Sequence, residues 1–101
     1  MKTLILFWYG STSSELEKLA RRAGFQFNEV ILVDSHWMTP PPNLDCVKTE
    51  NFRPVQDASY VVITNGAEHN QLVPVIAKLE ACQAEFEVYE FFYGELRKFW
   101  P

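Results

Sequence analysis

The sequence predicts a single α/β domain built around a mainly parallel sheet, and two observations carry this prediction. The apolar run Leu4–Tyr9 shows no alternation with polar residues, which is typical of a strand buried on both faces of a parallel sheet. An amphipathic helix over residues 13–23 follows that run directly, and a second strand and helix succeed each other in the same way later in the chain. Strands that alternate with helices predict βαβ-like units.

Length and composition bound what such a domain can do. The 101 residues, with 48% hydrophobic and 22% charged side chains, leave room for one folded domain over 1–101. The net charge of −4 excludes the basic surface that duplex nucleic acid or a membrane would need, but a small anionic ligand can still bind to backbone amides. The N-terminal apolar run is too short for a signal peptide or a membrane span, so we expect a cytoplasmic protein.

The first helix has the clearest local signals in the chain. Its apolar stripe consists of Leu16, Leu19, Ala20 and Ala23. Its N-terminus carries two overlapping capping-box matches, Thr12 with Glu15 and Ser14 with Glu17. Gly24 is placed to end the helix in the left-handed conformation, with Phe25 folding back onto the stripe.

The next two strands are predicted at Val30–Val33 and Tyr60–Thr64, separated by an irregular segment over 35–59. A segment of this length can cross from one side of the first strand to the other. With right-handed crossovers, the resulting strand order is 2-1-3-4, numbered along the chain.

The second helix carries Pro74, and proline is comfortable only in a helix's first turn. We therefore expect the regular helix to begin near Asn70 or Gln71. The fourth strand is predicted at 86–93, and its charged residues Glu87 and Glu90 indicate a strand at the edge of the sheet. Residues 95–100 are expected to form a short C-terminal turn.

These elements together predict a small Rossmann-like three-layer domain with a four-stranded, mainly parallel sheet. Ligands of such sheets bind beyond the carboxyl ends of the strands, where the strand order reverses. That point lies between the first and third strands here. The polar residues expected at this edge are Gly10, Ser11, Thr12, Ser13, Ser14, His36, Asn65, Gly66, His69 and Asn70.

The loop after the first strand has the chemistry of an anion site. A glycine and four hydroxyl side chains precede a helix N-terminus, whose unpaired amides attract negative charge. The alternative is that these hydroxyls only cap the helix. The loop matches neither GxxxxGK[ST] nor GxGxxG, so it is neither a Walker loop nor a dinucleotide fingerprint.

His69 is the candidate catalytic residue. The positive end of the second helix favours a neutral imidazole there, which can act as a general base or a hydrogen-bond donor. The alternative is a histidine that faces solvent in a turn. Neither His36, Glu68 and His69 nor the two cysteines have the spacing of metal ligands, so we expect no metal and no cofactor.

The first half of the chain, with its helix ending LARRAGF, resembles a glutaredoxin, but the thiols that define that family are replaced by the segment 10–13.

The chain also resembles the small ring nucleases of CRISPR systems, which are minimal CARF-like domains. That resemblance rests on the strand–loop–helix opening and on VVITNGAEHNQL over 61–72, and the arginine–histidine pair of that family's first loop is absent. It implies a homodimer that binds or cleaves cyclic oligoadenylate, with residues 11–14 in the ligand loop and His69 in the second.

Two functions therefore stay open. The first is a small nucleotide-binding protein, either without activity or as a metal-independent phosphodiesterase in which the substrate's own 2′-hydroxyl attacks. The alternative is a protein-interaction module, an adaptor or immunity-type protein, that uses its aromatic C-terminal strand.

Seven aromatic residues lie in the last sixteen positions, more than one small domain can easily bury. We expect a homodimer on this ground, unless the C-terminal turn folds back over the strand.

Overall fold

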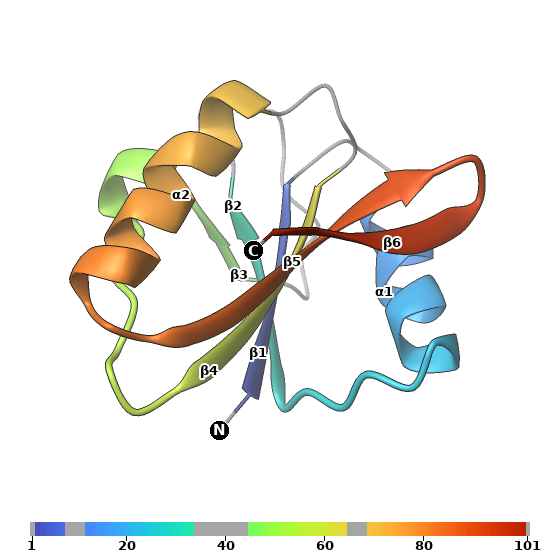
Figure 1. Cartoon of the computed structure of the whole chain (residues 1–101), viewed down its shortest axis with the longest axis horizontal. Coiled ribbons are helices and arrows are strands. Elements are labelled where there is room, and N and C mark those ends of the chain that lie inside the picture. The colour runs from blue at the N-terminus through green and yellow to red at the C-terminus, as the bar shows by residue number, and fades with distance from the viewer. Residues whose placement is uncertain (1, 8–11, 34–44, 65–68, 101) are drawn as a thin grey trace.

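The computed structural model describes residues 2–7, 12–33, 45–64 and 69–100. They form a sheet flanked by a helix on each face, so the chain is an α/β structure in three layers (Figure 1). The elements are β1 Lys2–Phe7, α1 Thr12–Arg22, β2 Glu29–Val33, β3 Asp45–Val47, the 3₁₀ turn η1 Thr49–Asn51, β4 Ser59–Thr64, α2 His69–Ala81, β5 Glu85–Phe92 and β6 Glu95–Trp100. No helix within these ranges is long and apolar enough to cross a membrane.

The sheet has six described strands in the order β3-β2-β1-β4-β5-β6, so the predicted four-strand order 2-1-3-4 is wrong as an account of the whole sheet. The predicted strands are the central four of the six, and each edge carries one strand more. The first five strands run parallel, while β6 is antiparallel to β5. The segment between β2 and β4 supplies β3 and η1 and does cross from one side of β1 to the other.

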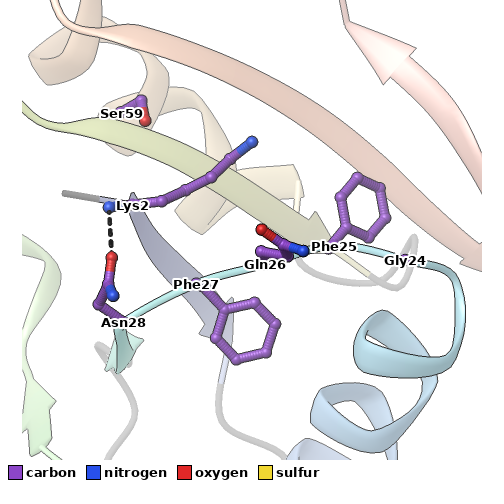
Figure 2. Close-up of a pocket in the computed structure, with 7 residues that line it drawn as sticks. All are labelled: Lys2, Gly24, Phe25, Gln26, Phe27, Asn28 and Ser59. Atoms are coloured by element: carbon purple, nitrogen blue, oxygen red, sulfur yellow. Dashed lines mark hydrogen bonds between the residues drawn. The ribbon is translucent and has the colours of Figure 1, made fainter.

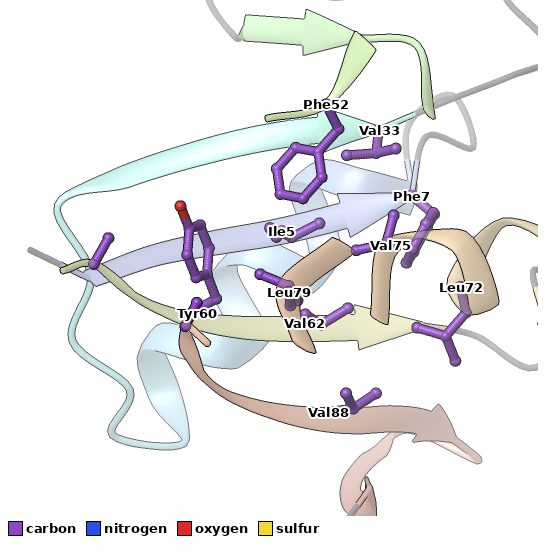
Figure 3. Close-up of a cluster of buried hydrophobic side chains, with 12 residues drawn as sticks. Ile5, Phe7, Val33, Phe52, Tyr60, Val62, Leu72, Val75, Leu79 and Val88 are labelled. Carbon is purple, nitrogen blue, oxygen red and sulfur yellow. The ribbon is translucent and has the colours of Figure 1, made fainter. Parts of the chain in front are cut away.

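Two apolar cores lie on opposite faces of the sheet, because successive residues of a strand point to opposite sides. The α2-side core consists of Ile5, Phe7, Val33, Phe52, Ala58, Tyr60, Val62, Leu72, Val75, Leu79, Ala84 and Val88 (Figure 3). The α1-side core consists of Leu4, Leu6, Leu16, Ala20, Phe27, Leu32, Val61 and Ile63. The continuous apolar pattern of β1 and β4 is therefore explained by helices that cover both faces.

Helix α1 begins at Thr12, so Thr12 and Ser14 lie inside its first turn and neither occupies the predicted N-cap position. Its C-terminus follows the prediction. Gly24 has a φ of 97°, and the Phe25 amide donates to the Ala20 carbonyl at 3.1 Å, which closes the turn that this motif requires. Phe25 packs against the α1-side core.

Helix α2 begins at His69, which places Pro74 in the second turn rather than in the predicted first turn. A proline there has no N–H to donate to the carbonyl of Asn70, four residues earlier. The apolar residues around it explain why the helix persists, since Leu72, Val75 and Leu79 are all buried in the α2-side core. Tertiary packing thus outweighs the loss of one helical hydrogen bond.

The C-terminal segment is strand β6 and not the predicted turn, so β5 is not the edge of the sheet. Tyr93 and Gly94 both have positive φ, 49° and 80°, and form a two-residue hairpin between Phe92 and Glu95. The charges that indicated an edge strand are matched across this hairpin. Two acidic residues of β5 pair with basic residues of β6, Glu90 with Arg97 at 3.2 Å and Glu87 with Lys98 at 3.1 Å.

Candidate ligand-binding site

The strand order reverses between β1 and β4, as the predicted site requires. The chain leaves β1 toward β2 and β3 on one side, then returns across β1 to β4 and β5 on the other. Helix α1 follows β1 and packs on one face, while α2 follows β4 and packs on the opposite face (Figure 1). The N-termini of both helices therefore come to the same carboxyl edge of the sheet, above two neighbouring strands.

The structure describes about half of the predicted site residues. Those that begin the helices are Thr12, Ser13 and Ser14 in the first turn of α1, and His69 and Asn70 in the first turn of α2. Those that lie outside the described residues are Gly10, Ser11, His36, Asn65 and Gly66. The topology thus brings the backbone of 12–14 and of 69–70 to one edge, at the positive ends of the two helices.

One cross-strand row of residues runs along this carboxyl edge on the α2 face. Its first half is apolar and belongs to or packs against the α2-side core: Val47, Val33 and Phe7, from β3, β2 and β1. Its second half is polar: Thr64, Glu90 and Arg97, from β4, β5 and β6, which are paired in register as Thr64 with Glu90 and Glu90 with Arg97. The row changes character between β1 and β4, where the strand order reverses.

The polar half of the row holds an unusual group. Thr64 is fully buried, and among the described residues its Oγ1 has no hydrogen-bond partner. Beside it, the Glu90 side chain is 12% exposed and its Oε1 accepts from Arg97 Nη2 at 3.2 Å. A buried hydroxyl without a partner costs free energy, and a carboxylate is seldom so enclosed unless it is paired. Polar side chains at this edge therefore cost the folded protein free energy that apolar side chains at the same positions would not.

A cavity of about 550 Å³ lies at the opposite, amino-terminal edge of the sheet. Polar side chains of Lys2, Gln26, Asn28 and Ser59 line it beside the Phe25 ring (Figure 2). The Lys2 amide donates to Asn28 Oδ1 at 3.1 Å, and the Asn28 amide donates back to the Lys2 carbonyl at 2.8 Å. This reciprocal pair fixes the floor of the cavity against β1. Sequence reasoning missed it because its residues lie in a connecting segment without a motif.

A small charged group surrounds Tyr89, whose ring meets Phe25, a residue that lines this cavity, edge-on at 4.8 Å. The Lys98 ammonium hydrogen-bonds Glu87 at 3.1 Å and lowers the pKa of that carboxyl, while partial burial opposes the shift. Burial raises the pKa of the Tyr89 hydroxyl, and the neighbouring Glu87 adds to the effect. Both groups are thereby held in the ionisation states that they have at neutral pH, a carboxylate and a neutral phenol.

The sequence signal for the polar row was present but was assigned to other causes. Glu90 was interpreted as edge protection, and Arg97 lay in a segment predicted as a turn.

Among the described residues, no three histidine, cysteine or acidic side chains cluster closely enough to hold a metal ion.

Comparison of the chain with protein-family models, with curated proteins and with solved structures finds no match, so the geometry of the chain itself carries the functional argument.

Proposed function

We propose that the protein binds a nucleotide or a related small phosphorylated ligand at the carboxyl edge of its sheet, in the manner of a Rossmann-like domain. One observation carries this proposal: β1 and β4 are neighbouring parallel strands whose following helices cover opposite faces. In open α/β sheets this arrangement leaves a crevice at the reversal point. Two helix N-termini border it, and their unpaired amides suit a phosphate group.

The finer form of the proposal is a metal-independent ring nuclease that acts on cyclic oligoadenylate. In that reaction a ribose 2′-oxygen attacks the adjacent phosphorus, and the bond from phosphorus to the 5′-oxygen breaks. The 2′-hydroxyl gives up its proton and the departing 5′-oxygen takes one, leaving a 2′,3′-cyclic phosphate. His69, at the start of α2, would transfer a proton, while the amides of 12–14 would stabilise phosphate charge.

Thermal unfolding with candidate ligands tests both forms. Inorganic phosphate, adenosine 5′-monophosphate and cyclic oligoadenylates of several ring sizes are each added with a metal chelator present. A ligand at about 100 times its Kd adds about 2.7 kcal/mol of stability, an upward Tm shift of roughly 10 °C for a domain of this size. Chromatography of the same mixtures detects cleavage. Absence of a shift with every ligand contradicts the proposal, and a shift without cleavage retains only the binding form.

The β5–β6 hairpin favours a second candidate, a protein-interaction module. Tyr93 at its tip is 89% exposed, and a cavity of about 160 Å³ lies beside it between α1 and the hairpin, lined by Leu16, Leu19 and Phe91 among others. Exposed aromatic side chains next to an apolar recess are common anchors at interfaces. The two candidates separate by mutation: His69→Ala removes cleavage if the ring-nuclease form of the first is right, and Tyr93→Ser removes partner binding if the second is right.

A further inference from the structure

The polar half of the edge row carries an inference that rests on the proposed function and specifies its ligand. We infer that Glu90 and Thr64 recognise a ribose hydroxyl, so that the site takes ribonucleotides in preference to 2′-deoxyribonucleotides. The two residues are register partners on adjacent strands and lie on the α2 face, at the edge where α2 begins.

The hydrogen-bonding capacity of Glu90 is only partly used. Its Oε1 accepts from Arg97, and among the described residues Oε2 has no hydrogen-bond donor. A carboxylate accepts hydrogen bonds and cannot donate them, so a group that binds at Oε2 must be a donor. A neutral hydroxyl fits this position. A phosphate does not, because its charge would repel the carboxylate.

Thr64 supplies the complementary group. Its hydroxyl can both donate and accept; it is fully buried beside Glu90 and has no partner among the described residues. A sugar hydroxyl that donates to Glu90 can accept from Thr64 at the same time. Because Thr64 is enclosed, the ligand reaches it by displacing neighbouring side chains at the edge, and the resulting hydrogen bonds lie in a medium of low dielectric, where they are strong.

Arg97 and the N-terminus of α2 complete the arrangement. The Arg97 side chain is 58% exposed at the outer end of the row, and its guanidinium hydrogen-bonds Oε1 of Glu90 at 3.2 Å. A nucleotide bound with its sugar on Glu90 would direct its phosphate toward the amides of the α2 first turn. The sugar hydroxyl and the phosphate are thus read by separate parts of the edge.

Paired ligands test this inference. Wild-type protein is titrated with cyclic tetra-adenylate and with its analogue lacking every 2′-hydroxyl, and with adenosine 5′-monophosphate and its 2′-deoxy form. We expect the ribose forms to bind roughly 10- to 100-fold more tightly, the worth of one hydrogen bond to a charged group. Glu90→Gln should remove most of that preference and leave deoxy binding nearly unchanged.

Two buried threonines give a matched control. Thr49, in η1, is also buried and its hydroxyl has no partner among the described residues, but it lies outside the row. Thr64→Val and Thr49→Val should both raise the Tm of the unliganded protein by a few degrees, since each replaces an unpaired hydroxyl by a methyl group of similar volume. Only Thr64→Val should weaken ribonucleotide binding.

The outcomes separate the two proposals. If no probe binds to the wild-type protein, the proposed function itself fails. If ribose and deoxyribose forms bind equally, the function stands and this inference is wrong. A lower Tm for Thr64→Val would show that its hydroxyl is satisfied within the protein, which also overturns the inference. Loss of ribose preference in Glu90→Gln, with Thr49→Val unaffected, supports it.

Discussion

Single residues decide how the two helices end. Both close with the same backbone motif, in which one residue adopts a positive φ and the next donates to a carbonyl of the last turn: Phe25 to Ala20, and Ala84 to Leu79, each at 3.1 Å. The residue at positive φ is Gly24 in α1 but Gln83 in α2, with a φ of 59°. A residue with a Cβ is strained in that conformation, and glycine is not.

Gln83→Gly should therefore stabilise the protein by about 0.5–1 kcal/mol, while Gly24→Ala should destabilise it by about 1 kcal/mol. A Cβ at Gly24 would meet no atom within 4 Å, so the cost there is conformational rather than steric. The midpoint of urea unfolding measures both changes. Gln83→Ala is the control for loss of the 3.4 Å side-chain contact with Gln56, and it should lack the gain. A lower midpoint for Gln83→Gly would contradict the assignment.

The ion pair between Glu87 and Lys98 predicts a specific pH dependence. The hydrogen bond from Lys98 lowers the pKa of Glu87 below its ordinary value of 4.5, so the folded protein binds this proton less readily than the unfolded chain. The stabilisation is present above that ordinary value and is lost as the pH falls through the lowered pKa. The effect is small, because both side chains are at least 40% exposed.

Urea unfolding between about pH 6 and pH 3 checks this dependence, since that range spans the titration of a carboxyl group. Lys98→Met should flatten the loss of stability on acidification, because the variant has less to lose. Lys18→Met is the control: it removes a lysine of the same charge from exposed α1 positions, far from Glu87 in the sequence. Parallel pH curves for Lys98→Met and wild type would show that the pair has no influence on stability.

At the scale of elements, the pattern of apolar residues predicted the buried strands and the first helix. A continuous apolar run is typical of a buried strand, and apolar residues at helical spacing are typical of an amphipathic helix. The hairpin escaped prediction for a physical reason. Two-residue turns with both φ values positive usually carry Asn-Gly or Asp-Gly, whereas here the turn is Tyr93-Gly94. Without that signal, the charges of β5 indicated an edge strand. Their basic partners lie on β6 and are visible only after the two strands are paired.

The candidate site shows the same division between local and non-local information. Residues 12–14 and 69–70 were placed at one edge from strand order alone, because the carboxyl ends of parallel strands share an edge. Thr64, Glu90 and Arg97 were not recognised together, because they come from three strands and are neighbours only through the register of the sheet. The spacing of these three residues along the sequence therefore does not indicate that they are neighbours in the sheet.

At the scale of the whole molecule, the structure revises the reasoning behind the predicted homodimer. Three of the seven C-terminal aromatic residues pack within the domain, Phe86 against the α2-side core and Tyr89 and Phe91 against the α1-side core. The pairing of β6 with β5 covers the strand whose exposure the prediction assumed. Two of these C-terminal aromatic residues stay exposed on the hairpin, Tyr93 and Phe99, of which Phe99 is 41% exposed.

We still predict a homodimer, now through β6. This strand ends the described sheet on one side, and the basic side chains that would guard an edge, Arg97 and Lys98, are paired with β5 instead. Two copies can join their β6 strands across a two-fold axis and enclose Phe99.

Light scattering at micromolar concentration should give twice the 11.7 kDa mass of one chain. Phe99→Arg should yield monomers, whereas Val73→Arg, at an exposed position on α2, should not. A wild-type mass of one chain would refute the dimer, and a dimer that survives Phe99→Arg would refute this interface.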